Sequence, residues 1–455
     1  MNNQSNFSRR NFLRLGASAG MLAGLGHLNF SEAAQSATDY KALVCVFLFG
    51  GADGHNTVIP QSQSEYAAYV SKRGGLALSG TQLLPITATG GGQYALNHGL
   101  VEMQTLFQQG RMAVVANTGL LYQPTTQQQY QQGAVALPTQ LFSHSDQIVQ
   151  MQSGVPSSSS SSGWGGRIAD ALQTNNANAT GPVSISFNGS ALSCAGQSVN
   201  GTSLQPGNVL SQNAMNGGWP PAAIVARGEA QKQIVTLANS NRLIAAADRT
   251  FNDAWQLGTM FKNLGNTTPF TTPFPTSSIG NQLKDVAKFI SLRAQTGAGR
   301  QVFFVGLGGF DTHSAQEYQL WDLYRQVSQA LKAFYDTTVE LGVANRVTSF
   351  TLSDFGRSLQ PSGTGSDHGW GNHLMVIGGA VNGGRVHGQF PVMNANDSAY
   401  TPNAFADSRG VMLPTTALAQ FGGTLGKWMG VPDNQLNGLF PELANFAVRD
   451  VGFMQ

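Results

Sequence analysis

Apolar residues are distributed along the chain in two patterns, and each pattern predicts a different kind of secondary structure. Residues 41–49, 301–305 and 346–352 form apolar runs rich in strand-forming side chains, which is typical of strands buried on both faces. Residues 279–296 and 315–341 have the character of helices, and the second repeats apolar side chains at helical spacing. Because strands and helices alternate, we predict an α/β fold with a largely parallel central sheet and helices on both faces.

The first 37 residues have the pattern of an export signal. Arg9 and Arg10 precede a short apolar stretch that ends in small residues, which is typical of a twin-arginine signal peptide. We therefore expect a periplasmic or secreted protein that meets the twin-arginine translocase during export. No later run reaches the roughly 18 apolar residues of a transmembrane helix, so no stable membrane span is expected. Residues 38–455 are predicted to form one α/β domain with an irregular insertion over about residues 190–275.

Charge and cysteine content narrow the possible functions. The 455 residues include 25 basic and 23 acidic side chains, and residues 1–37 hold three of the basic and one of the acidic ones. The remainder is formally neutral, which argues against nucleic acid as a partner. Only Cys45 and Cys194 are present, so a thiolate-rich metal site is excluded. Cys45 lies in an apolar run and is expected to be a buried core residue, although a single disulfide with Cys194 also fits the sequence.

Histidines close to acidic residues are the main chemical feature of the chain. Asp53 and His55 follow the first predicted strand, and Asp311 and His313 follow the strand at 301–305. Carboxyl ends of parallel strands meet at one edge of a sheet, and carboxylate with imidazole suits zinc, manganese or iron(II). Any one cluster could instead be structural. The remaining histidines after residue 37 are His98, His144, His368, His373 and His387, with Asp367 directly before His368.

Two further residues are open to a catalytic or an ordinary structural interpretation. Arg357 comes just after a predicted strand, where it could bind an anion or form a surface salt bridge. Ser143 stands at a predicted helix start, where helix amides can stabilise an oxyanion and the hydroxyl could act as a nucleophile. The alternative for Ser143 is an N-cap serine.

Taken together, these motifs resemble a family of bacterial exported proteins known as the domain of unknown function number fifteen-oh-one. The resemblance covers nearly the whole chain after the signal. Its motifs are residues 50–60, 110–115, 141–147, 163–167, 309–313, 353–357, 367–368 and 409–416. That family is similar in fold to the alkaline phosphatase and sulfatase superfamily, which binds one or two metals at strand ends beside a nucleophile.

The resemblance implies roles for particular residues. Asp53, Asp367 and His368 would bind one divalent ion, and Asp311 and His313 would bind a second one. His373 or His387 would complete the second site, and the ions would be zinc, manganese, iron or calcium. Ser143 would be the nucleophile. Arg357 remains a second candidate catalytic residue because of its position just after a strand. Neither cysteine is followed by the x-Pro-x-Arg sequence that a formylglycine sulfatase needs.

The expected function is therefore an exported metal-dependent hydrolase of phosphate or sulfate esters. Its substrate would be a small-molecule or polysaccharide ester. The alternative is a non-catalytic exported metal-binding or assembly protein with the same fold.

Overall fold

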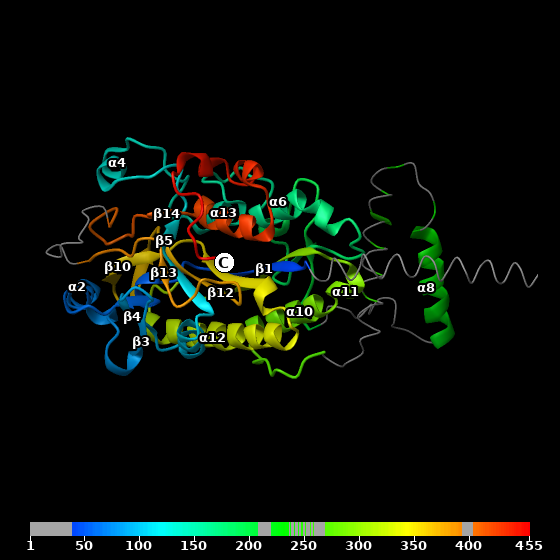
Figure 1. The fold of residues 1–455 in the computed structure, drawn as a ribbon, viewed down its shortest axis with the longest axis horizontal. Helices are drawn as coiled ribbons and strands as arrows, with labels where there is room; N and C mark the ends of the chain where they lie inside the picture. Colours follow the sequence, from blue (N-terminus) through cyan, green and yellow to red (C-terminus); the bar gives the residue numbers. More distant parts are fainter. Residues whose placement is uncertain are drawn as a thin grey trace, which may run out of the picture.

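The computed structural model describes residues 39–207, 220–235, 269–393 and 404–455, with isolated positions between 237 and 258. A nine-stranded sheet runs through this part of the protein, with the order β13-β5-β12-β9-β1-β8-β6-β7 and with β14 also paired to β5 (Figure 1). The strands are β1 (Lys41–Leu48), β5 (Met112–Gly119), β6 (Ser184–Ser186), β7 (Thr202–Ser203), β8 (Arg300–Leu307), β9 (Val347–Ser353), β12 (Asn372–Gly378), β13 (Val386–His387) and β14 (Thr416–Ala417).

The sheet is largely parallel, as its apolar strands predict. β1 pairs in parallel with both β8 and β9, whereas β12 runs antiparallel to both of its neighbours, β5 and β9. Two smaller antiparallel sheets are separate from it. They are β2 (Val58–Pro60), β4 (Gln93–Asn97) and β3 (Leu83–Thr87), and the hairpin of β10 (Arg357–Ser362) and β11 (Gly365–His368).

Helices cover both faces of the sheet, and β1 shows why. Its alternate residues belong to different clusters: Val44 and Val46 lie in one core cluster, and Leu43 and Phe47 lie in the other. The first face carries α3 (Val101–Gln108), α10 (Ser278–Ser291) and α12 (Gln316–Glu340). The opposite face carries α5 (His144–Ser153), α6 (Trp164–Ala171), α13 (Leu418–Met429) and α14 (Leu436–Leu439) (Figure 1). The predicted fold class is confirmed.

The remaining helices lie away from these layers or in short connections. They are α2 (Gln63–Arg73), α4 (Gln127–Gln132), α8 (Pro221–Val235) and α11 (Arg293–Thr296). The helix predicted over 279–296 is divided into α10 and α11, and α8 belongs to the predicted insertion. The predicted signal peptide and parts of the insertion lie outside the described residues. Within the described part, no helix combines the length and apolar character that crossing a bilayer requires.

Both cysteines are buried free thiols, so the interpretation of Cys45 as a core residue is confirmed. Cys45 is 2% exposed and lies in the cluster that α6 and α13 cover. Burial raises the pKa of its thiol well above the usual range, which makes it an inert apolar group.

Replacing Cys45 with serine should lower the free energy of unfolding by about 1–3 kcal/mol, because the variant places a hydroxyl among apolar side chains. Urea denaturation of the variant and the wild type measures the difference. An unchanged stability would mean that the hydroxyl finds a partner in the core, and Cys45→Ala serves as the control for lost volume.

Candidate metal centre

The segment after β8, the end of β11 and the start of α5 bring their side chains together. Asp311 and His313 follow β8, and His368 is the last residue of β11. His144 is the first residue of α5. Gly50, in the loop after β1, permits a close approach, because a Cβ atom at this position would lie 2.3 Å from the backbone nitrogen of Asp311.

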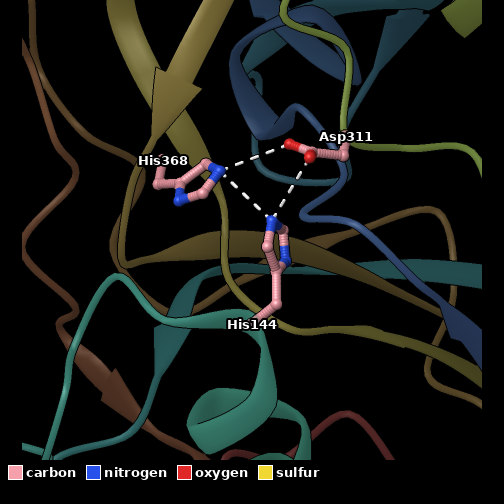
Figure 2. A group of neighbouring side chains, drawn as sticks. All are labelled: His144, Asp311 and His368. Atoms are coloured by element: carbon pink, nitrogen blue, oxygen red, sulfur yellow. Dashed lines mark hydrogen bonds and ion pairs between the residues drawn. The ribbon is translucent and has the colours of Figure 1, made fainter.

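The ring nitrogens of three histidines converge on the Asp311 carboxylate. The Nε2 atom of His368 lies 3.2 Å from that of His144 and 3.1 Å from that of His313. The Asp311 carboxylate lies 3.5 Å from His144 Nε2, 3.3 Å from His368 Nε2 and 2.8 Å from His313 Nε2. Figure 2 shows His144, Asp311 and His368 facing one another. Asp311 and His368 therefore each lie close to two further possible ligands, His144 and His313.

The other ring nitrogen of two histidines faces a hydrogen-bond acceptor. His368 Nδ1 lies 2.8 Å from the carbonyl oxygen of Phe142, which can only accept, and His144 Nδ1 lies 2.7 Å from Asp354 Oδ2. In each neutral ring the proton is therefore on Nδ1, and Nε2 carries a lone pair. Two lone pairs that face each other across 3.2 Å repel unless a cation or a proton lies between them.

These contacts fit a metal ion. Ligand nitrogens around a tetrahedral zinc lie about 3.3 Å apart, because each zinc–nitrogen bond is about 2.0–2.1 Å. Histidines that ligate metals usually donate their other N–H to a carboxylate or a backbone carbonyl, which is the arrangement of His144 and His368. Imidazole with carboxylate suits zinc, manganese or iron(II).

A second group overlaps the first. His313, Asp367 and His368 also place one ligand atom each within 4.8 Å of the others, as do His144, Asp311 and His368. The two groups share His368, whose Nδ1 is engaged by a carbonyl. Since one Nε2 atom coordinates one ion, the groups are best interpreted as alternative ligand sets for a single ion.

Asp354 orients His144 from a buried position at the end of β9. Its side chain is fully buried, and its two oxygens also lie 3.2 Å from the backbone nitrogen of Gly50. The hydrogen bond to Asp354 raises the pKa of His144, an effect that burial opposes and that the charge of Asp311 reinforces. Asp354 therefore fixes both the ring position and the tautomer.

Arg357 lies behind Asp311. Its buried guanidinium donates through Nη1 to Asp311 Oδ1 at 3.0 Å and to the carbonyl of Gly50 at 3.0 Å, and it also donates to the carbonyl of Ser366. Burial works to raise the pKa of Asp311, but Arg357 and the neighbouring histidines lower it overall. The arginine thus keeps a half-exposed carboxylate ionised and in place.

Arg409 holds Asp367 in a similar way. Its Nη1 atom lies 3.2 Å from Asp367 Oδ2, and its Nη2 atom lies 2.9 Å from Asp407 Oδ2. The guanidinium also lies over the ring of Phe142, 5.2 Å from its centroid. Unlike Arg357, Arg409 is 41% exposed, and its Nε atom also donates to Asp407 Oδ2 at 3.0 Å.

The structure does not bring Asp53 into either ligand group. Its side chain is fully buried and pairs with Arg73 at the end of α2, and its Oδ1 accepts a hydrogen bond from the backbone N–H of His55 at 3.1 Å. The amide of Gln316 also donates to its other oxygen. All of these contacts are those of a structural carboxylate.

His373 and His387 also lie apart from both groups. His373 is buried, accepts a hydrogen bond from the backbone N–H of Asn117 at Nδ1, and stacks on Phe390 at 4.6 Å between centroids. His387 is half-buried, with Nε2 3.0 Å from the carbonyl oxygen of Asn382. Burial lowers the pKa of His373 to about 3 and also lowers that of His387.

Acid should destabilise the metal-free protein through His373. The native ring has a pKa of about 3 against 6.5 when unfolded, so only the unfolded state gains a proton as the pH falls below 6.5. The contribution of His373 to the free energy of unfolding is fully present above pH 6.5, and about 2 kcal/mol of it is lost between pH 7 and pH 5. Urea denaturation in EDTA at both pH values measures how the free energy of unfolding depends on pH. In His373→Gln this dependence should be weaker than in the wild type, by the uptake of about one proton on unfolding. An equal slope in both proteins would contradict the burial of a neutral ring.

Ser143 precedes α5 as its N-cap residue, but its side chain makes no capping bond. Its hydroxyl donates to Asp146 Oδ2 at 2.7 Å and lies 3.1 Å from the hydroxyl of Ser145. The hydrogen bonds from Ser143 and Ser158 lower the pKa of Asp146. Ser143 is thus next to the candidate ligand His144 in sequence, and its hydroxyl donates to a carboxylate.

Sequence reasoning predicted four of the converging residues and missed others. Asp311, His313, Asp367 and His368 were expected and are brought together. His144 lies in a short motif at a helix start, but the sequence alone does not assign it to the metal. Asp354 and Arg409 lie in the motifs at residues 353–357 and 409–416, but nothing local in the sequence indicates their partners.

Several solved structures resemble this one at low similarity. The PsFucS1 sulfatase from Pseudoalteromonas sp. matches with a TM-score of 0.36 and 10% identity, covering 94% of this chain and 77% of its own. BT1596, a 2-O GAG sulfatase, matches with 0.33 and 7%, covering 88% and 74%. A variant of the alkaline phosphatase PafA matches with 0.27 and 11%, covering 70% and 64%.

Comparison of the sequence with known families is more decisive. No curated protein matches the chain. The profile described as "Protein of unknown function (DUF1501)" matches residues 40–440, which include every converging side chain described above. The chain therefore belongs to the DUF1501 family.

Proposed function

We propose that this protein is an exported metal-dependent hydrolase of phosphate or sulfate esters. The observation that carries the proposal is the convergence of three imidazole nitrogens on Asp311, with the tautomers of His144 and His368 set by Asp354 and a carbonyl. A divalent ion bound there would act as a Lewis acid toward the ester oxygen and lower the pKa of a bound water.

The protein side chains then have separate tasks. Arg357 is a positioning residue, because its N–H groups are committed to Asp311 and to backbone carbonyls. Arg409 is half-exposed beside Asp367, so its guanidinium suits the free oxygens of a phosphate or sulfate group. Ser143 is the protein nucleophile in this scheme, and Asp146 holds its hydroxyl proton.

A panel of esters tests the proposal. Purified protein is loaded separately with zinc, manganese and iron(II), and its hydrolysis of p-nitrophenyl phosphate and p-nitrophenyl sulfate is followed by absorbance. We expect turnover that EDTA removes and that His144→Asn lacks. Ser143→Ala distinguishes attack by the Ser143 hydroxyl from attack by a water molecule, because the variant loses activity only if Ser143 is the nucleophile. Metal-loaded protein that hydrolyses no ester would overturn the proposal.

A non-catalytic metal site is the second candidate, and one observation favours it. If His313 joins His144, Asp311 and His368 around one ion, four protein ligands would close the coordination sphere, as they do in structural zinc sites. His313 decides between the two, since its side chain is 48% exposed. If His313→Ala keeps the metal and the activity, that position is open to water; if the ion is lost, the site is closed.

The export route is a proposal from the N-terminal sequence. Changing both Arg9 and Arg10 to lysine should hold the precursor in the cytoplasm, because the arginine pair is the recognised address. Cell fractionation with an antibody measures this. Normal periplasmic accumulation of the double variant would contradict twin-arginine export.

A further inference from the structure

A cavity of about 540 Å³ lies beside the metal centre, between the start of α12 and the turn of the β10–β11 hairpin. The cavity is lined by segments that also carry candidate ligands. Ala315 lines the cavity two residues after His313, and Thr364 lines it from the hairpin that carries His368. The hairpin packs tightly against this segment, because a Cβ atom on Gly365 would lie 2.2 Å from the carbonyl carbon of His313.

The segment between the two sites is held in an unusual conformation. Ala315 has a φ of 47°, the left-handed region that residues other than glycine seldom adopt. The hydroxyl of Thr364 accepts a hydrogen bond from the Ala315 N–H at 3.0 Å, and the Thr364 carbonyl accepts one from the Gln316 N–H at 3.1 Å. These bonds hold the cavity wall at Ala315 and Thr364 in a defined position relative to the candidate ligand His313.

Aromatic rings form one side of the cavity. Tyr318 and Trp321 lie on α12 with their ring centroids 5.7 Å apart. His98 stacks on Trp321 at an interplanar angle of 14°, and the Arg325 guanidinium lies 5.6 Å from the Trp321 ring. Trp321 is thus held by its neighbours, whereas Tyr318 is 70% exposed and offers its ring to a ligand.

The polar part of the lining is neutral or acidic. Glu317 contributes a carboxylate, which accepts a hydrogen bond from Gln82, and Thr364 contributes a hydroxyl. Among the described residues that line the cavity, none is lysine or arginine. A strongly anionic ligand would find no counter-charge there, while hydroxyl groups would find acceptors.

We infer that this cavity is a subsite for a neutral sugar ring. A pyranose has an apolar C–H face that stacks on an aromatic side chain, and its hydroxyls donate to carboxylate and hydroxyl oxygens such as those of Glu317 and Thr364. This inference rests on the proposed function and deepens it: the sugar is the alcohol part of the ester whose phosphate or sulfate group lies at the metal centre.

Ligand-observed NMR with EDTA-treated protein tests the subsite without the metal. The probes are neutral methyl pyranosides and neutral disaccharides, with methyl glucuronide and AMP as anionic competitors. We expect the neutral sugars to bind, and Tyr318→Ala to weaken them about tenfold. Tyr318→Phe keeps the ring and should bind as the wild type does, and Tyr122→Ala, whose ring lies outside the cavity lining, is the matched control.

The outcomes separate the subsite from the proposed activity. Absence of neutral-sugar binding, a preference for the anionic probes, or equal binding by Tyr318→Ala would each overturn the subsite, even if the metal-loaded protein hydrolyses esters. If sugar binding needs Tyr318 but the metal-loaded protein hydrolyses no ester, the subsite is supported and the proposed hydrolase activity is ruled out. If both hold, Tyr318→Ala should raise KM for a sugar ester about tenfold and leave kcat nearly unchanged.

Discussion

Asp311→Asn should reduce metal affinity by more than about 100-fold, because groups that only orient ligands are already worth about 10–100-fold. Asp311 is the one carboxylate within 3.5 Å of all three converging imidazoles among the described residues. The amide removes a negative charge but keeps the shape of the side chain. The fold should survive, because the side chain is 44% exposed and Arg357 retains its carbonyl partners.

Elemental analysis after expression with zinc, manganese and iron supplied measures the result. Asp354→Asn should lower affinity less, by about 10–100-fold, since Asp354 acts through His144. Asp450→Asn is the matched control, because Asp450 pairs with Lys427 on the surface. Wild-type protein that carries no metal would contradict the whole site, and Asp311→Asn with full metal would show that this carboxylate is not a ligand.

Arg73→Met should destabilise the protein by about 3–5 kcal/mol, the usual consequence of removing one member of a buried ion pair. Arg73 and Asp53 are both fully buried. Arg73 also donates to the carbonyls of Ser358 and Leu359 at 2.7 and 2.8 Å, so the variant leaves a buried carboxylate and two backbone acceptors without their partner. Urea denaturation measures the loss of unfolding free energy.

The same pair tests the role of Asp53. Asp53→Asn combined with Arg73→Met removes both charges and should recover part of the stability that Arg73→Met loses. Asp53→Asn alone should keep its metal, because Asp53 is committed to Arg73, Gln316 and the His55 N–H. A folded Asp53→Asn protein without metal would instead make Asp53 a ligand, as the resemblance implies.

The central elements could be predicted from local pattern. The apolar runs of β1, β8 and β9 and the helical repeat of α12 depend on side chains near one another in sequence. Their predicted bounds agree with the structure within two residues. The positions of Asp311 and His313 after a strand also predicted that they lie at one edge of the sheet, where the structure brings them close to His368. The reversed direction of β12 has no comparable local signal.

The chain by itself therefore determined the alternating fold and the residue types at the sheet edge. It did not determine which of several similar Asp and His residues meet. Asp53 follows a strand much as Asp311 does, but Arg73, 20 residues away, pairs with it, while Arg357 keeps Asp311 at the half-exposed centre. His144 joins His368 across 224 residues. Such partners depend on long-range packing and on the direction of each side chain, which only the tertiary structure decides.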